Sequence, residues 1–288
     1  MKTFFPRKRR SNCALGAVLA GFSLLTAGVL SLPPPAAAVG GTYPATVPFA
    51  LGERLTYKIE WNPPWFLFFL PPMEAGEATL SLFGETQYQN RKAFKITFTA
   101  RSSGTLAKMA GISINDYFEF ISDEETFCTY SVVKRVKEGQ WMQNIDYVYL
   151  PEAGKLHLRE VDVSKATPIV LRDRDYDGIP PCVMDIFSAL YFLRKKELAP
   201  GVSLHALVGE NEVVKDVQIS VEKKELVHAP AGDFNAWKIS TTAIIGGLFK
   251  GGGEFHIWLS ADERKLPVKF EAKTYLGKAT GSLKQVKN

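Results

Sequence analysis

Strict alternation of apolar and polar residues constrains the fold of this chain more than any other feature. The segments Leu55–Trp61 and Phe94–Ala100 alternate without a break. Successive side chains of a strand point to opposite faces, so each segment puts its apolar residues on one face, as a half-buried antiparallel strand does. The sequence therefore predicts a mainly β protein.

Further segments show similar patterns, and turn-forming residues separate them, as at Glu152–Gly154 and Pro230–Asp233. These segments are Ala78–Leu82, Tyr117–Ile121, Phe127–Val136, Ile145–Leu150, Leu156–Val163, Val217–Val221, Trp237–Ala243, Phe255–Leu259 and Val268–Ala272. Strands at this spacing are typical of an antiparallel sandwich or of open, barrel-like sheets.

One segment follows helical spacing instead. Between Cys182 and Lys196 the apolar residues recur every three or four positions, and basic residues close the last turn, where they suit the helix dipole. We expect one helix over 183–196, packed on a sheet. Residues 39–288 are expected to form a single β-rich domain, with a candidate internal boundary at the loop and helix of residues 172–200.

The first 38 residues have the layout of a secretory signal peptide. A basic head ending at Arg7–Arg10 precedes the apolar run Ala14–Leu32, and Ala36–Ala38 forms a small-residue exit. Cleavage after Ala38 is expected, and the alternative is an uncleaved membrane anchor. The layout predicts an exported protein of the periplasm, either soluble or peripheral to a membrane.

Removal of this leader changes the charge of the protein. The leader holds five of the 35 Lys and Arg residues and none of the 30 Asp and Glu residues, so the remainder is formally neutral. The basic character of the whole chain therefore gives no support for a nucleic-acid partner. Later apolar runs are shorter than the about 20 residues that a membrane-spanning helix needs.

Two cysteines remain after the leader, Cys128 and Cys182. In an oxidising compartment such a pair is a candidate disulfide. The alternative is two separate buried thiols that act as small hydrophobic residues.

The segment from Asp173 to Gly178 resembles the start of a calcium-binding loop. Asp173, Asp175 and Asp177 supply hard oxygen ligands at alternate positions, and a glycine follows. However, Met184 stands where the closing glutamate of such a loop belongs. The alternative is a solvated acidic turn that leads into the helix.

The sequence contains no recognisable catalytic or cofactor motif. The four histidines lie far apart, no Cys-x-x-Cys pair occurs, and no Gly-x-Ser-x-Gly turn is present. We therefore expect no metal and no cofactor, and we assign no catalytic residues. A hydrolase whose site assembles from distant strands remains an alternative.

The segment that would gain most free energy by leaving water is an apolar run between two proline pairs, Pro63-Pro64 and Pro71-Pro72. Its residues are Trp65, Phe66, Leu67, Phe68, Phe69 and Leu70. Prolines interrupt a sheet ladder and favour a loop. Burying each large side chain gains about 1.5–3 kcal/mol, so this loop is expected to pack on the core, line a ligand cavity, bind a partner or enter a membrane surface. The Gly-rich apolar stretch Ile244–Phe249 strengthens the lipid interpretation if it lies beside the loop.

Short motifs along most of the chain resemble a bacterial exported family known as domain of unknown function 3108. They are Phe49-x-x-Gly52-Glu53-x-Leu55-x-Tyr57, Ala75-Gly76-Glu77-Ala78, Asp185-x-x-Ser188-x-x-Tyr191-Phe192-x-Arg194, Ala231-Gly232-x-Phe234, and Ile257-Trp258-Leu259-x-x-Asp262 with Leu266-Pro267-Val268. The resemblance implies a β-rich envelope protein without an assigned activity, and it supplies no catalytic residues. The shared positions are interpreted as architecture: Gly52, Gly76 and Gly232 at turns, Trp258 and Leu259 in a strand, and Asp185 as a cap at the helix start.

The chain departs from this family pattern between Trp61 and Ala75, where the proline-bracketed loop intervenes. The leading hypothesis is a non-catalytic envelope protein that contacts an apolar ligand, a lipid or an envelope partner through Trp65–Leu70. The second is a purely structural or assembly module in which this loop is packed inside.

Overall fold

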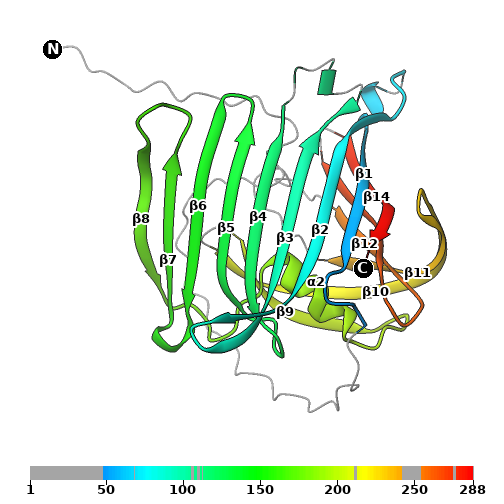
Figure 1. The fold of residues 1–288 in the computed structure, drawn as a ribbon. Helices are drawn as coiled ribbons and strands as arrows, with labels where there is room; N and C mark the ends of the chain where they lie inside the picture. Colours follow the sequence, from blue (N-terminus) through cyan, green and yellow to red (C-terminus); the bar gives the residue numbers. More distant parts are fainter. Residues whose placement is uncertain are drawn as a thin grey trace.

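Fourteen antiparallel strands form one continuous sheet in the part of the chain that the structure describes (Figure 1). The computed structural model describes residues 48–67, 69–104, 107, 108, 111, 113–210, 213–241, 254–274 and 277–287. The signal peptide predicted at 1–38 and the stretch Ile244–Phe249 lie outside these residues. The strands are β1 (Arg54–Asn62), β2 (Met73–Tyr88), β3 (Arg91–Ser102), β4 (Asn115–Asp123), β5 (Thr129–Glu138), β6 (Trp141–Leu150), β7 (Lys155–Asp162), β8 (Ile169–Asp177), β9 (Ser203–Glu210), β10 (Val213–Ala229), β11 (Gly232–Thr241), β12 (Glu254–Ser260), β13 (Pro267–Thr274) and β14 (Gly277–Lys287).

The strand order shows that the two ends of the described chain meet in the middle of the sheet. It runs β8-β7-β6-β5-β4-β3-β2-β1-β14-β13-β12-β11-β10-β9, so the first and last strands pair at its centre. Figure 1 shows β1 to β8 as one broad layer, with β10 and β11 crossing behind it. The sheet therefore folds over on itself and encloses an inner face, while β8 and β9 remain as its two edges.

The inner face carries the apolar residues that alternation predicted. Leu55, Leu82 and Ile96 from the broad layer are fully buried, as are Ile239 and Leu259 from the layer behind. Helix α2 (Ile186–Arg194) is inserted against this face. Its ring of Phe187 packs on Phe98 of β3 and Phe120 of β4, with centroid distances of 4.7 and 5.2 Å.

The predicted mainly β, barrel-like class with one packed helix is confirmed. Each predicted strand overlaps an observed one, but β8, β9 and β14 were not predicted. The helix is shorter than the predicted span 183–196. Its first residues are extended instead, because Val183 and Met184 form backbone hydrogen bonds with Thr129 and with β9.

Two of the three predicted glycine turns are confirmed. Gly52 and Gly232 adopt positive φ angles of 92° and 133° at strand ends. The prediction for Gly76 was wrong, because Gly76 lies within β2 and pairs with Ile59 and Ser102. A Cβ atom there would lie 2.2 Å from the backbone oxygen of Arg101, so close strand packing requires glycine at this position.

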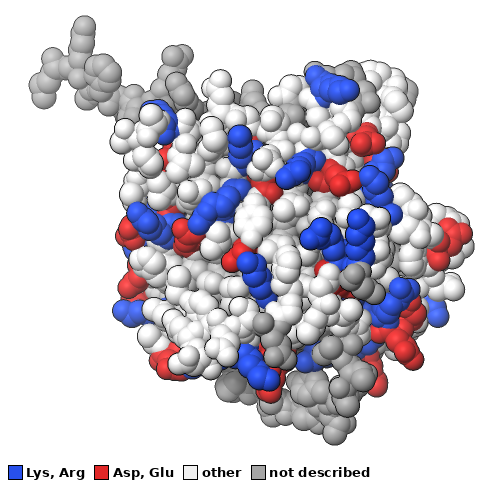
Figure 2. Space-filling model, viewed as in Figure 1, with Lys and Arg blue, Asp and Glu red and all other residues white. Residues whose placement is uncertain are grey.

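Charges of both signs are interspersed on the outer face of the broad layer (Figure 2). Cross-strand ion pairs account for part of this mixture, including Lys95–Glu119 at 2.9 Å and Arg135–Asp146 at 2.6 Å. Such a surface gives no single-sign field for an extended polyanion. Among the described residues, no helix is long and apolar enough to cross a membrane.

Candidate functional site

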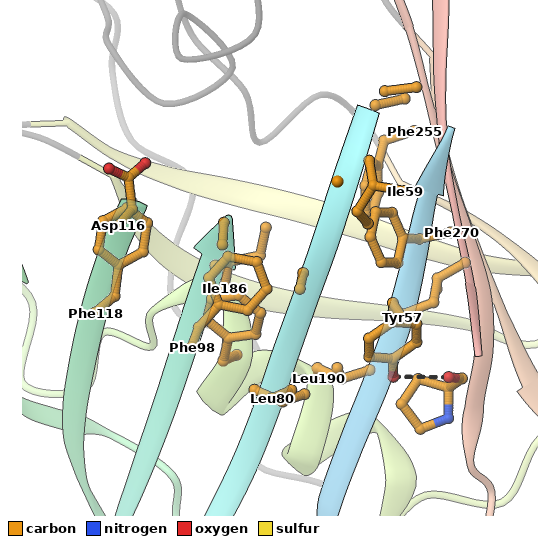
Figure 3. Close-up of a pocket in the computed structure, with 18 of the residues that line it drawn as sticks. Tyr57, Ile59, Leu80, Phe98, Asp116, Phe118, Ile186, Leu190, Phe255 and Phe270 are labelled. Carbon is orange, nitrogen blue, oxygen red and sulfur yellow. Dashed lines mark hydrogen bonds between the residues drawn. The ribbon is translucent and has the colours of Figure 1, made fainter. Parts of the chain in front are cut away.

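An apolar cavity of about 280 Å³ lies between the inner face of the sheet and α2 (Figure 3). Residues of β1 to β5 form one wall, and residues of β10 to β14 form the other. Apolar lining residues include Tyr57, Ile59, Leu80, Phe98, Phe118, Ile186, Leu190, Leu193, Phe255, Ile257 and Phe270. This volume lies just below the range for small-molecule sites in proteins, about 300–1,000 Å³, so it suits a single slender apolar group.

Helix α2 forms the floor of the cavity because its start is fixed from both sides. Asp185 caps the helix, as its family position implied, and its carboxylate accepts hydrogen bonds from the backbone N–H groups of Phe187 and Ser188. The hydroxyl of Thr129 donates to the same carboxylate at 2.8 Å. Burial raises the pKa of Asp185, although these hydrogen bonds act in the opposite direction. The apolar side of α2 is thereby held toward the cavity.

A buried ion pair fixes the other end of α2. Arg194 is fully buried, and its guanidinium donates to both carboxylate oxygens of Glu53, at 2.6 and 2.9 Å. The guanidinium also lies over the rings of Phe49 and Tyr191 and donates to the backbone oxygen of Arg264. These contacts join the motif residues Phe49 and Glu53 to the motif residues of α2 and to the segment after β12.

The aromatic loop lies at the opposite rim, between the end of β1 and the start of β2. Trp65–Leu67 form a short 3-10 helix, and Trp65, Phe66 and Phe69 are 86%, 53% and 68% exposed. Leu67 and Leu70 are half-buried, and Phe68 lies outside the described residues. The described aromatic residues of this loop therefore project into solvent and do not pack on the core as the alternative interpretation expected.

The base of this aromatic loop is packed tightly against β14. Gly277 has a φ angle of 113°, and a Cβ atom there would lie 2.3 Å from the backbone oxygen of Asn62. Backbone hydrogen bonds from Leu67 to Pro64 and from Leu70 to Leu67 close the turn. The exposed rings are thus presented from a firm base. Ile59 and Ala75, which line the cavity, lie on β1 and β2 beside the same base.

Two carboxyl groups face inward at this rim of the cavity, Asp116 of β4 and Glu138 of β5. Each is only 5% exposed, and Figure 3 shows Asp116 at the end of the cavity away from α2. Asp116 accepts a hydrogen bond from the backbone N–H of Lys137 at 2.8 Å. Burial raises the pKa of Asp116 to about 6, and burial together with the charge of Asp116 raises the pKa of Glu138 to about 7.

Because of these two groups, stability is expected to fall as pH rises from about 4 to about 7. Glu138 changes from a pKa of 4.5 when unfolded to about 7 when folded, so the folded protein keeps a proton that the unfolded chain releases. The stabilisation is complete below the unfolded pKa and is lost as pH approaches the folded value. Urea unfolding at several pH values should show this slope in the parent protein and a flatter one in Glu138→Gln. Equal slopes would contradict the assignment.

Sequence analysis missed both carboxyl groups, although a signal was present. Asp116 has the same strand parity as the buried Phe118 and Phe120, and Glu138 has that of Val132 and Val136. A carboxylate in phase with a buried apolar face is the feature that identifies them.

The structure corrects the interpretation of the acidic segment as a loop or turn. Asp173, Asp175 and Asp177 occupy alternate positions of strand β8, opposite basic residues of β7. His157 lies 2.8 Å from Asp175, Arg159 3.4 Å from Asp173, and Lys155 3.6 Å from Asp177. A strand spreads these carboxylates along one face, so they do not converge as calcium ligands do. Within the described part of the chain, no cluster of His, Cys, Asp and Glu has a metal-binding arrangement.

The structure joins Cys128 and Cys182 in a disulfide, with a Cα–Cα distance of 5.0 Å. The bridge ties the β4–β5 connection to the segment that enters α2. The four histidines each lie near an Asp or Glu, but none of them lines the cavity. The structure therefore brings no histidine to this cavity.

The folded-over antiparallel sheet around an apolar cavity defines a β-barrel-like protein. The chain belongs to the family described as protein of unknown function (DUF3108), whose model matches residues 56–284.

Two solved structures resemble this fold. A β-barrel-like protein of domain of unknown function DUF1849 from Brucella abortus has a TM-score of 0.53 at 11% identity, over 82% of this chain and 97% of that one. A "putative exported protein with YmcC-like fold" from Bacteroides fragilis has a TM-score of 0.32 at 10% identity, over 83% and 97%. No curated protein matches the chain. The first of these supports the fold alone.

Proposed function

We propose that this protein is a non-catalytic envelope protein that binds an apolar ligand in its cavity and contacts lipid through the aromatic loop Trp65–Leu70. The observation that carries this proposal is that the apolar cavity extends to the rim of the sheet from which the exposed rings of Trp65, Phe66 and Phe69 project, since Ile59 and Ala75 line it beside the base of the loop. A hydrocarbon chain that leaves a membrane beside these rings would enter the cavity without crossing the polar outer face.

Energetics favour contact of this loop with an apolar phase. Removing a large side chain fully from water gains about 1.5–3 kcal/mol, and three such rings are mostly in solvent. Trp65 and Phe66 pack edge to face at 5.9 Å, so they form one apolar projection. Aromatic residues are suited to the boundary between lipid head groups and hydrocarbon.

Export supports the same proposal. The leader predicted at 1–38 would direct the protein to the periplasm, a compartment bordered by membranes. The disulfide is consistent with an oxidising environment. A protein peripheral to one of these membranes would meet its lipid ligand there.

Replacing Trp65, Phe66 and Phe69 together by serine is expected to lower vesicle binding at least tenfold without lowering the melting temperature. The reason is that these side chains are exposed in the folded protein. Flotation with vesicles of phosphatidylethanolamine and phosphatidylglycerol measures the binding. A matched control is Val213→Ser with Leu226→Ser, which removes two other exposed apolar side chains, both on β10.

Equal vesicle binding by the folded triple variant and the parent would overturn the role of the aromatic loop. Cooperative destabilisation of the triple variant, with no vesicle binding by the parent, would instead favour the structural or assembly module.

A further inference from the structure

The two inward carboxyl groups at the rim differ in how they are satisfied. Asp116 accepts the backbone N–H of Lys137, but within the described chain the carboxylate of Glu138 has no hydrogen bond and no ion pair. Glu138 is only 5% exposed as a residue, and a carboxylate shielded from water in this way is costly to ionise without a partner. A hydrogen-bond donor that reached this carboxylate would therefore stabilise its ionised form.

The neighbouring cations of the protein are directed elsewhere. Lys134 also faces inward on β5, but its ammonium group lies over the rings of Phe118 and Tyr147, at 5.9 and 5.4 Å. Arg101 donates to the side chain of Asn115 at 3.2 Å. The acidic end of the cavity thus keeps two carboxyl groups without a cationic side chain paired to them in the described residues.

The position of these groups relates them to the apolar cavity. Glu138 pairs with Ile114 across the strands, one inward position beyond Val136, and both Ile114 and Asp116 line the cavity with it. From this end the lining becomes apolar toward α2, through Phe118 and Phe98 to Leu190 (Figure 3). The cavity therefore has one acidic end and one hydrocarbon end.

From this polarity we infer that the cavity binds a single-chain amphiphile with a protonated amine head, which lies between Glu138 and Asp116 while the tail extends toward α2. This inference rests on the proposed function, because it assumes that an apolar chain occupies the cavity. An ammonium group donates three hydrogen bonds and neutralises the carboxylates. A fatty-acid head would add a third negative charge beside two. The raised pKa values of the two groups agree with carboxyl groups that have no counter-charge beside them among the described residues.

Dodecylamine, dodecanol and dodecanoic acid share one tail and differ in the head group, so together they test the inference. Calorimetric titration of the purified protein at pH 7.5, below the micellar range of each compound, should show dodecylamine binding at least tenfold more tightly than the other two. Glu138→Gln is expected to weaken dodecylamine binding about tenfold or more and to leave dodecanol unchanged, since one charge-assisted contact is lost. Asp116→Asn, which keeps the acceptor for Lys137, serves as the second variant.

Glu119→Gln is the matched control, because Glu119 lies on β4, the strand of Asp116, but pairs with Lys95 on the outer face. It removes the same charge and should leave dodecylamine binding unchanged. Equal or tighter binding of dodecanoic acid would overturn the inference, and so would unchanged dodecylamine binding in both cavity variants. In either case, binding of dodecanol would still support the proposed function. Absence of binding by all three compounds would overturn both.

Discussion

Replacement of Arg194 by methionine is expected to lower the free energy of unfolding by about 3–5 kcal/mol, because it leaves the carboxylate of Glu53 buried without its partner. Glu53 is 3% exposed and Arg194 is fully buried, so water cannot replace the lost contact. The same change removes the donor to the backbone oxygen of Arg264 and the cation above Phe49. Chemical denaturation of the purified variant measures the loss.

The double variant Glu53→Leu with Arg194→Met separates the cost of an unpaired charge from the loss of packing. Exchanging both members of a buried pair for apolar groups is often neutral or stabilising. We therefore expect the double variant to be more stable than Arg194→Met alone. Equal destabilisation by the single and double changes would show that the hydrogen bonds around Arg194, and not the charge of Glu53, dominate.

Opening the Cys128–Cys182 disulfide is expected to cost about 2–4 kcal/mol of stability, since the bridge closes a loop with a sequence separation of 54 residues. The loop contains β5 to β8, so its closure removes much freedom from the unfolded chain. Thermal unfolding with and without a reductant measures this effect. In the double variant Cys128→Ser with Cys182→Ser the reductant should change nothing, and a further drop in its melting temperature would contradict the disulfide as the cause.

The strands that could be predicted are those that have one buried and one solvated face. Tyr117–Ile121 is an example, since Phe118 and Phe120 are buried while their neighbours are more exposed. Strand β8 was missed because almost all of its residues are exposed on both faces, which leaves no apolar period. Strand β14 was missed because Gly281 interrupts its pattern. The ring of Phe270 occupies the space of a side chain there, with 2.1 Å between a Cβ atom and the ring.

Of the candidate site, only the aromatic loop, which is contiguous in sequence, could be predicted. Trp65 and Phe69 could be predicted because six consecutive large apolar residues between two proline pairs form a conspicuous loop in any fold. The cavity could not be predicted, since Tyr57, Phe98 and Phe270 meet only after distant strands pair. Alternation specifies which face a residue occupies but not which strand lies opposite, so the site depended on the strand order.

The acidic strand β8 has a consequence for the solubility of the protein. An unpaired sheet edge invites another strand and can begin aggregation. Alternation puts Arg172 and Arg174 on one face of β8 and Asp173, Asp175 and Asp177 on the other. When two copies of β8 approach as antiparallel neighbours, opposite residues share a face, so an arginine never stands directly across from an aspartate in any register. The residues that resemble a calcium motif thus discourage one protein from extending the sheet of another.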